Sequence, residues 1–457
     1  MSEQAVLLEL EVGAVAHGGH CVARHEGRVV FVRHALPGER VRARVTEAGE
    51  GASFWRADAV EVLEPSPDRV EPACPVAGPG RCGGCDWQHA HLPAQRALKT
   101  AVLREQLARL AGLEVDAVVE EVPVPASAGT SAEDAARGLG WRTRVGYAVD
   151  GDGRLGFRAH REHRVVPVER CPLATPGVVD LGLPEHRWKG WRAVEAVVPA
   201  GDGGRLVVAE GRSGAGRGPS LPALATEVAT ATTAPTGPRR PPAPVRQVRG
   251  RTWVRETVGG RSFRVTGGGF WQVHPGAAQT LSSAVLEAAR PRGGEVVLDL
   301  YSGAGLLTAA LAEAVGEGGR VVAVEGDARA VADARRNLHD LPQVRLVQAD
   351  VRVALAGAVG GGGQAGRAGE VPATADVVVL DPPRTGARAA VVAAVAARAP
   401  RAVVHVACDP AALARDVALF AEHGYALASL RAFDLFPSTH HLEAVALLAP
   451  AAPARDA

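Results

Sequence analysis

The sequence has no long apolar run, almost no lysine and little net charge. No stretch reaches the roughly 18 consecutive apolar residues that a membrane-spanning helix needs, so we expect no membrane segment. Met1–Glu11 is acidic and lacks the basic region and apolar core of a secretory signal. The only lysines are Lys99 and Lys189, so arginine supplies nearly all the positive charge, and the net charge is +1. Arginine suits phosphate contacts, but a codon bias explains its excess more simply, because Ala, Gly and Pro are also abundant.

Cysteine is scarce too, with six residues in 457. Without a signal or a membrane segment, we expect a cytoplasmic protein. In that compartment cysteines serve metal binding or catalysis more often than disulfides. The length allows two or three domains and a substantial core.

The N-terminal part has a β-rich pattern of short apolar runs separated by Gly or Pro. This pattern predicts a small antiparallel barrel of the oligonucleotide-binding type, ending at Pro65-Ser66-Pro67. A helix is predicted over Ala94–Leu110, where leucine recurs at helical spacing. The predicted strands are Leu7–Val12, Gly27–Val32, Glu39–Val45 and Trp55–Val62.

Three segments have no periodicity and a composition that cannot bury a core. We expect them to be mobile loops or linkers. They are Pro123–Ala136, Gly211–Gly250 and Gly357–Gly369.

From about Gly294 apolar strands alternate with Ala-rich helices such as Ala328–Leu338. This alternation is typical of a parallel, doubly wound α/β sheet. The segment Ala426–Leu448 instead predicts two strands around a Phe436–Thr439 turn. The parallel strands are expected at Glu295–Leu300, Arg320–Glu325, Val344–Gln348, Asp376–Leu380 and Ala402–Ala407.

The turn Asp299–Gly305 follows the first of these strands and precedes a helix. Its small residues let the backbone approach a ligand. Glu325 ends the second strand, where an acidic side chain can accept both hydroxyls of a ribose, and Asp350 follows the third. The third glycine of a dinucleotide fingerprint is missing. A nucleoside cofactor without a pyrophosphate is therefore favoured over a nicotinamide.

Three blocks end at the same predicted sheet edge: Asp381–Gly386, Cys408–Asp416 and Phe436–Glu443. Asp409 is a plausible N-cap after Cys408, with Pro410 at the first helical position, so the helix dipole would favour a thiolate. Considered alone, a cysteine such as Cys408 is most often a small buried side chain, and a glutamate such as Glu443 is most often exposed to solvent. Together they suit methylation of uracil carbon 5, which needs a thiolate to add to carbon 6 and a base to remove the carbon 5 proton.

Residues 261–449 resemble the RNA uridine-5 methyltransferases that act on transfer or large-subunit ribosomal RNA. The likeness lies in these blocks, in Asp299–Gly305 and in Phe270-Trp271-Gln272-Val273. It implies a class I S-adenosylmethionine methyltransferase fold, with Cys408 as nucleophile and Glu443 as base. It also implies that the cofactor and target-base pocket is lined by Gln272, Tyr301, Glu325, Asp350 and Asp381. The sequence departs from the family where Leu306 and Asp409 replace asparagines.

The N-terminal barrel resembles the TRAM RNA-binding domain of the same family, which implies structured RNA as partner. Phe270 or Trp271 is a candidate to stack on a flipped base. No obligate protein partner is evident. Phosphate contacts are expected from Arg24, Arg28, Arg33, Arg40, Arg42 and Arg44, although a solvated arginine face explains them equally well.

Four cysteines suggest a metal site: Cys74, Cys82, Cys85 and Cys171. Zinc is the default metal for four thiolates. The family resemblance implies instead a 4Fe-4S cluster, whose thiolate ligation is chemically ordinary. The spacing does not fit radical S-adenosylmethionine chemistry. Cys21 has no assigned role.

These patterns divide the chain into a TRAM-like barrel at 1–65, a central α+β iron-sulfur domain at 66–260, a methyltransferase domain at 261–449 and a disordered tail at 450–457. These patterns leave two other functions open. An amino methyltransferase acting on adenine or glutamine nitrogen would want an aromatic residue where Arg384 stands, and would not need Cys408. A non-catalytic iron-sulfur RNA-binding protein would not need Cys408 or Glu443.

Overall fold

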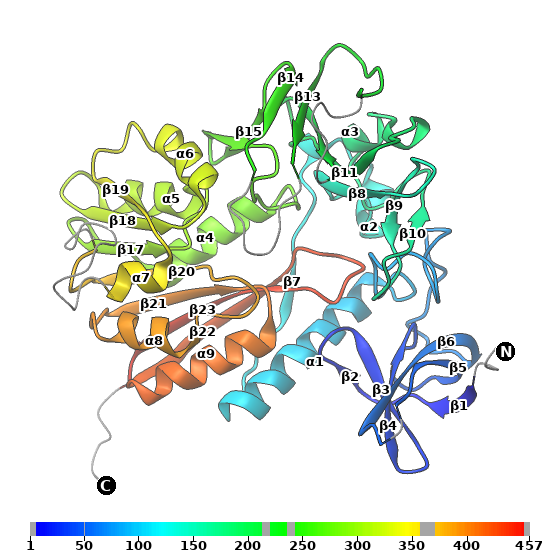
Figure 1. Cartoon of the computed structure of the whole chain (residues 1–457). Coiled ribbons are helices and arrows are strands. Elements are labelled where there is room, and N and C mark those ends of the chain that lie inside the picture. The colour runs from blue at the N-terminus through cyan, green and yellow to red at the C-terminus, as the bar shows by residue number, and fades with distance from the viewer. Residues whose placement is uncertain (1–5, 50, 213–219, 235–242, 357–370, 452–457) are drawn as a thin grey trace, which may run out of the picture.

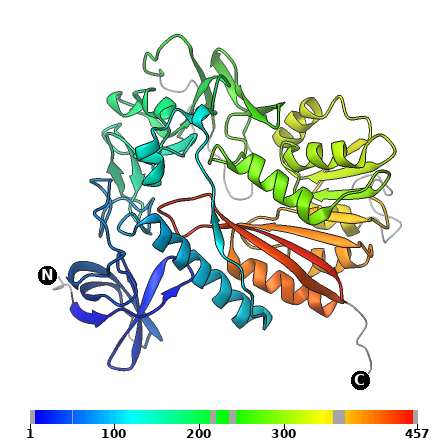
Figure 2. The same ribbon diagram turned by 180° about the vertical axis from the view of Figure 1, so that it is seen from behind.

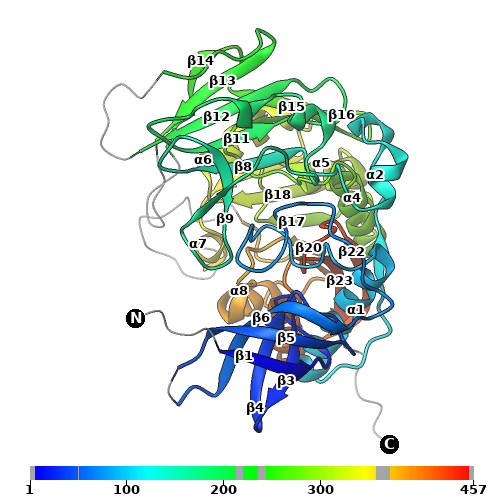
Figure 3. The same ribbon diagram turned by 90° about the vertical axis from the view of Figure 1, so that its right-hand side faces the viewer.

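The computed structural model describes residues 6–49, 51–212, 220–234, 243–356 and 371–451. Their strands form sheets of six, seven, two and eight strands. The six-stranded and seven-stranded sheets lie at opposite ends of the molecule, beside the eight-stranded sheet (Figures 1 and 3). No helix among the described residues is both long and apolar enough to span a bilayer.

The N-terminal sheet has the order β1-β5-β6-β4-β3-β2. Alternate side chains of β1 are buried, as expected for a sheet with one solvated face. Cys21 is fully buried in this core and its thiol donates to the carbonyl of Ala35, so it fills space in the sheet. The four predicted strands correspond to β1, β4, β5 and β6, but β3 was not predicted. The strands are β1 (Leu7–Glu11), β2 (Val15–Ala16), β3 (His20–His25), β4 (Arg28–Arg33), β5 (Arg40–Glu47) and β6 (Phe54–Glu64).

The middle of the chain forms the seven-stranded sheet, in the order β10-β9-β8-β11-β12-β13-β14. The helical segments α3 (Pro176–Val179) and η2 (Leu183–Glu185) lie in this part of the chain. The strands are β8 (Arg144–Val149), β9 (Leu155–Arg158), β10 (Val165–Pro167), β11 (Trp191–Val197), β12 (Arg205–Gly211), β13 (Val228–Thr233) and β14 (Arg246–Arg249).

Two of the three predicted loops contain regular structure. Within Gly211–Gly250, β13 pairs in parallel with β12, because its Val and Thr side chains suit a pleated, half-buried surface. Within Pro123–Ala136 the chain forms η1 (Ala126–Ala128) and the short helix α2 (Ala132–Ala136), whose N-cap Ser131 accepts from the amide of Asp134. The third predicted loop, Gly357–Gly369, lies outside the described residues.

The C-terminal part forms the eight-stranded sheet, in the order β19-β18-β17-β20-β21-β23-β22-β7. Its first five strands are parallel and helices cover both faces, which confirms the predicted α/β architecture (Figure 1). The hairpin of β15 (Trp253–Val258) and β16 (Arg261–Thr266) precedes it. The strands are β17 (Val296–Leu300), β18 (Arg320–Glu325), β19 (Val344–Gln348), β20 (Val377–Leu380), β21 (Ala402–Ala407), β22 (Tyr425–Asp434) and β23 (Glu443–Pro450). The helices are α4 (Ala277–Ala289), α5 (Leu306–Val315), α6 (Ala328–Asn337), α7 (Val351–Ala356), α8 (Arg388–Ala396) and α9 (Pro410–Glu422).

Two elements that precede residue 261 belong to this part of the structure, a helix that packs on it and a strand that joins the sheet. Helix α1 (Leu92–Ala111) packs along α9, and β7 (Val119–Glu121) pairs in parallel with β22 at the sheet edge (Figure 2). Lys99 of α1 is fully buried, and its ammonium lies 2.6 Å from the Asp434 carboxylate and donates to the carbonyl of Phe436. Because a buried charge needs such partners, α1 is tied to the turn that follows β22.

Candidate active site

Cys408 and Glu443 lie opposite each other on neighbouring strands. In the antiparallel register Ala407 pairs with Ala444, so the next positions outward are Cys408, just after β21, and Glu443, the first residue of β23. The loop that begins at Asp381 follows the neighbouring strand β20. The sheet therefore brings the three predicted blocks to one edge, as parallel strands that end together require.

The segment after Cys408 begins helix α9 as predicted. Asp409 has an extended backbone and its carboxylate accepts from the amide of Ala412 at 2.8 Å, with Pro410 at the first helical position. The thiol itself differs from expectation. Burial, and next the Glu443 carboxylate, raise the pKa of Cys408 to about 12, while Arg384 opposes the rise. A thiol with so high a pKa is protonated at neutral pH, and desolvation is the largest cause.

Glu443 is buried, with 4% of its surface exposed. Burial raises its pKa well above the usual range, the Asp381 carboxylate adds to the rise, and Arg384 opposes it. Burial also raises the pKa of Asp381, to about 7. A buried and a half-buried carboxyl group that repel each other in this way hold a proton readily. Glu443 is thus suited to accept a proton from a bound molecule, and is not a solvated strand residue.

The turn after β17 forms a second polar region. Tyr301 has a φ of 65°, a left-handed conformation that is unusual for a bulky residue. Glu325 accepts from the amide of Gly303 at 2.9 Å, so the end of β18 faces this turn. Among the described residues, Asp299 Oδ1 and Ser302 Oγ are buried without a hydrogen-bond partner. Unpaired buried polar atoms around an open glycine turn fit a polar ligand, since such groups are otherwise satisfied.

The remaining predicted pocket residues are less tightly placed. Asp350 is exposed, accepts from the amide of Val353 and contributes to a raised pKa of Tyr301, so it faces the same region. Gln272 is half-buried in the segment between β16 and α4. Trp271 is buried against Phe263, with ring centroids 5.4 Å apart, whereas Phe270 is 75% exposed. Of the two aromatic candidates for stacking on a base, only Phe270 is accessible.

Asp416 of α9 had no predicted role, yet it holds the loop that carries Asp381 and Arg384. Its carboxylate accepts from the amides of Ala387 at 2.6 Å and Arg388 at 3.1 Å. Gly386 has a φ of 79°, and an added Cβ would lie 2.6 Å from Asp416 Oδ2. The sequence signal was the spacing between Cys408 and Asp416, which places the carboxylate two helical turns into α9.

The loop before Glu443 is held by helix α1 and by the segment just before it, which carries Cys82 and Cys85. Ser438 donates its amide to Gln95 and accepts from the amides of Asp86 and Trp87. Asp86 also binds the His440 ring at 2.7 Å. The position of the predicted base therefore depends on residues more than 340 positions earlier in the chain.

The four predicted metal ligands lie near one another without closing on a common point. Cys171 acts electrostatically on the other three thiols, and burial is the main cause that raises the pKa of each, that of Cys85 to about 12. Amide groups donate to two sulfurs, from Gly84 to Cys82 and from Gln88 to Cys85. In the described part of the chain, however, no three Cys, His, Asp or Glu side chains form a group that would hold a metal ion.

The arginines of the N-terminal sheet have varied surroundings. Arg33 is buried and lies 3.7 Å from Asp86, which contradicts its predicted role in phosphate contacts. Arg40 and Arg42 form ion pairs with surface glutamates. Arg28 lies over the Trp55 ring, 4.4 Å from its centroid. Arg24 and Arg28 form no ion pair with any described residue.

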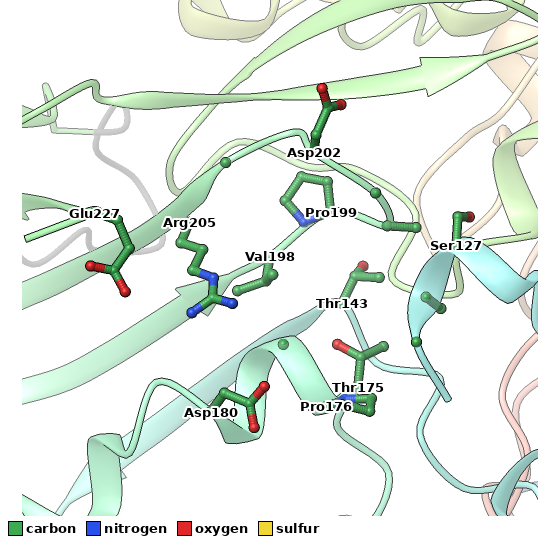
Figure 4. A pocket seen from close by; sticks show the side chains of 16 residues that line it. Ser127, Thr143, Thr175, Pro176, Asp180, Val198, Pro199, Asp202, Arg205 and Glu227 are labelled. Carbon is green, nitrogen blue, oxygen red and sulfur yellow. The ribbon is translucent and has the colours of Figure 1, made fainter. Parts of the chain in front are cut away.

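A separate hollow of about 470 Å³ opens in the seven-stranded sheet region, between β11, β12, α3 and η1 (Figure 4). Thr143, Thr175, Asp180 and Arg205 line it. The Thr175 hydroxyl is buried and, within the described residues, has no hydrogen-bond partner. No predicted site residue lines this hollow.

Comparisons with known proteins agree with this arrangement. Residues 4–55 match the TRAM domain model, and residues 251–450 match the tRNA (uracil-5-)-methyltransferase model. An uncharacterized RNA methyltransferase of Streptomyces avermitilis is 49% identical, over 97% of this chain and 98% of its own length. One of Streptomyces coelicolor is 48% identical, over 97% and 93%.

A solved structure shares the fold. The Pyrococcus abyssi tRNA (uracil-54, C5)-methyltransferase, in complex with S-adenosyl-L-homocysteine, superimposes with a TM-score of 0.70. Its sequence is 21% identical, and the match covers 96% of this chain and 100% of that one. With a TRAM domain at its N-terminus and these close relatives, the chain belongs to the RNA (uracil-5-)-methyltransferase family, enzymes that take their methyl group from S-adenosylmethionine.

Proposed function

We propose that this chain forms 5-methyluridine in a structured RNA, a transfer or ribosomal RNA, with Cys408 as a covalent nucleophile and Glu443 as the base. The observation that carries the proposal is the register that sets Cys408 opposite a buried Glu443. A thiol next to a proton acceptor is what addition to carbon 6 and proton removal from carbon 5 require.

In the proposed reaction, Cys408 loses its proton to solvent as its sulfur forms a bond to uracil carbon 6. The ring electrons move toward the carbonyl, and carbon 5 becomes able to take a methyl group. S-adenosylmethionine, when bound, supplies that methyl group from its sulfonium. Glu443 then takes the proton from carbon 5, the bond between sulfur and carbon 6 breaks, and its electron pair returns to Cys408. The raised pKa of Glu443 favours this proton transfer.

We assign the cofactor and target-base pocket to Gln272, Tyr301, Glu325, Asp350 and Asp381. The unpaired buried atoms of Asp299 and Ser302 beside this turn support the assignment, because a polar ligand would satisfy them. Phe270, exposed beside Gln272, is the proposed stacking residue for RNA. The proposed domains are 1–65, 66–260 and 261–449, with a short tail at 450–457, and the proposed location is the cytoplasm.

The covalent step can be tested with RNA containing 5-fluorouridine, in which the carbon 5 fluorine cannot leave as a proton does. The unaltered protein should form a stable adduct, seen as a shifted band in a denaturing gel, and Cys408→Ala should form none and lose methylation. With ordinary RNA, Glu443→Gln should accumulate a methylated adduct. Methylation by Cys408→Ala at the normal rate would remove the mechanism. Mapping 5-methyluridine in transfer and ribosomal RNA from a deletion strain identifies the substrate.

We further propose that Cys74, Cys82, Cys85 and Cys171 hold a 4Fe-4S cluster. The support is the chemistry of four thiols that influence one another, with amide donors to two sulfurs. Anaerobically purified protein should then contain about four iron atoms per chain and absorb broadly in the visible range. Cys82→Ser should lose both, whereas Cys21→Ser should keep them. Zinc without iron would contradict the cluster.

A further inference from the structure

A turn of the N-terminal sheet lies against both segments that carry the proposed reacting groups. His17, between β2 and β3, places its Nε2 2.9 Å from Oδ2 of Asp409, the residue after Cys408. Gly19 of the same turn is so close to His440 that an added Cβ would lie 2.8 Å from the histidine Cβ. The Trp87 indole donates to the carbonyl of Gly19 at 3.1 Å. The turn therefore contacts Asp409, which follows Cys408, and His440, which lies three residues before Glu443.

Asp409 uses its two oxygens differently. Oδ1 caps helix α9 through the amide of Ala412, and Oδ2 faces His17. An asparagine would cap a helix equally well, so the cap does not explain the negative charge. That charge is one cause of the raised pKa of Cys408, because it disfavours a second negative charge beside it.

His17 is placed to offset this charge. The hydrogen bond to Asp409 raises its pKa above the ordinary value, against the effect of burial. Of the helices packed nearby, α1 contributes Glu105, which adds to the rise, and α9 contributes Arg415, which opposes it. His17 is therefore protonated to a higher pH than an isolated histidine. The ion pair is complete below the raised pKa and is lost as the pH rises through it.

We propose that His17 is a positioning residue for the methylation: through its ion pair with Asp409 it fixes the start of α9 and offsets a carboxylate charge next to the Cys408 thiol. The TRAM-type turn then serves the reaction centre directly, in addition to any contact with RNA. This inference rests on the proposed covalent role of Cys408.

The test measures the reactivity of Cys408 in the full-length protein without RNA. Iodoacetamide alkylation is followed at the Cys408 peptide by mass spectrometry between pH 6 and 9.5, for the unaltered protein, His17→Gln, Asp409→Asn and the double variant. Glutamine keeps a neutral hydrogen-bond donor and removes the charge. His163→Gln, at an exposed position of the central part, is the matched control.

At pH 6 to 7, His17→Gln should slow alkylation by about threefold to tenfold, since a tenfold change corresponds to one pKa unit. The ratio between the two proteins should approach one above the pKa of His17, where the unaltered side chain is also neutral. In the Asp409→Asn background, His17→Gln should have no effect. A His17→Gln rate equal to the unaltered one at pH 6 to 7, or the same slowing in the Asp409→Asn background, would overturn the proposal.

A single-turnover assay at saturating RNA extends the test to the reaction. His17→Gln should slow adduct formation with 5-fluorouridine RNA by a similar factor and leave the RNA dissociation constant unchanged. Weaker RNA binding with an unchanged rate would show instead that His17 contacts RNA. Methylation by Cys408→Ala would contradict the proposed function, whereas the alkylation ratios would still report on the ion pair.

Discussion

At the scale of single residues, the site combines a thiol with three carboxyl groups, of which Asp299 and Glu443 are buried and Asp381 is half-buried. Asp299, Asp381 and Glu443 all have pKa values raised mainly by burial. Arg384, whose own side chain is exposed, opposes the raised pKa values of Cys408 and Glu443. A protonated thiol is a poor nucleophile and resists oxidation. Burial therefore keeps Cys408 largely unreactive in the resting protein, and Arg384 opposes this effect.

The pH dependence of Cys408 alkylation follows from this arrangement. Because burial raises the pKa of the thiol to about 12, the thiolate fraction of the His17→Gln protein, in which residue 17 does not titrate, should rise about tenfold for each pH unit between 7 and 9. Arg384→Gln should lower the rate about threefold to tenfold throughout this range. Peptide mass spectrometry after timed alkylation checks both, with buried Cys21 as the internal control for unfolding. A rate that levels off below pH 9 would contradict the raised pKa.

At the scale of elements, Asp416 connects α9, which follows the nucleophile, to the loop after β20. Gly386 allows the close approach, with both a left-handed backbone and no room for a side chain. Gly424, at the end of α9, has the same φ of 79° and nothing within 4 Å of an added Cβ. Alanine substitutions at the two glycines therefore separate two costs in stability. Both substitutions strain a left-handed backbone, but only the one at Gly386 also brings a side chain against Asp416.

Gly424→Ala should lower stability by about 1–2 kcal/mol, the cost of a left-handed conformation for alanine. Gly386→Ala should cost more, since Asp416 must move, and it should also reduce methylation as the loop carrying Asp381 and Arg384 shifts. Thermal melting and a methylation assay on both variants measure the two effects. Equal melting temperatures and equal activities would show that the Asp416 contact has no role.

The bounds of several strands could be predicted from the sequence where a stretch had a clear strand pattern. Strands β18, β19 and β21 begin and end at the predicted residues. For β18 and β21 the reason is a nearly continuous apolar run of the kind that marks a buried parallel strand, whereas β19 has an arginine at its second position and is only partly buried. Strand β13 was missed because its alternating Ala and Thr resemble linker composition, and only pairing with β12 gives it a buried face. Strand β3 was missed because histidine and arginine occupy its more exposed positions.

At the scale of the whole molecule, the contacts that unite distant segments could not be predicted. His17 meets Asp409 across 392 residues, and Lys99 meets Asp434 across 335. Local spacing contains no signal for such pairs. The local sequence also did not indicate the raised pKa of Cys408. It shows that Cys408 precedes a helix, but the burial that raises the pKa depends on every element around the site. The sheet edge that brings the motif residues together was predicted, because the strand ends that carry them were recognised.

RNA binding by the N-terminal sheet should depend on arginines that are not already paired with carboxylates. Arg24→Ala combined with Arg28→Ala should weaken RNA binding and reduce its salt dependence. A variant that makes fewer phosphate contacts releases fewer counterions from the RNA when it binds. Arg40→Ala combined with Arg42→Ala should have a smaller effect, since these side chains already neutralise surface glutamates. Fluorescence anisotropy at two salt concentrations compares the pairs. A larger loss from the second pair would place the RNA on the other arginines.

Strand β7 has a consequence for synthesis. Its residue Glu120 binds Arg431 of β22, 311 positions later, so the ribosome makes this sheet edge long before the strand it joins. At about 5–20 residues per second, the early segment waits roughly 15 to 60 s for its partner. Throughout that interval the nascent chain must keep this short strand and the apolar side of α1 from pairing with other segments. A shortened protein that begins after residue 121 would leave the ribosome with β22 as an unpaired edge strand.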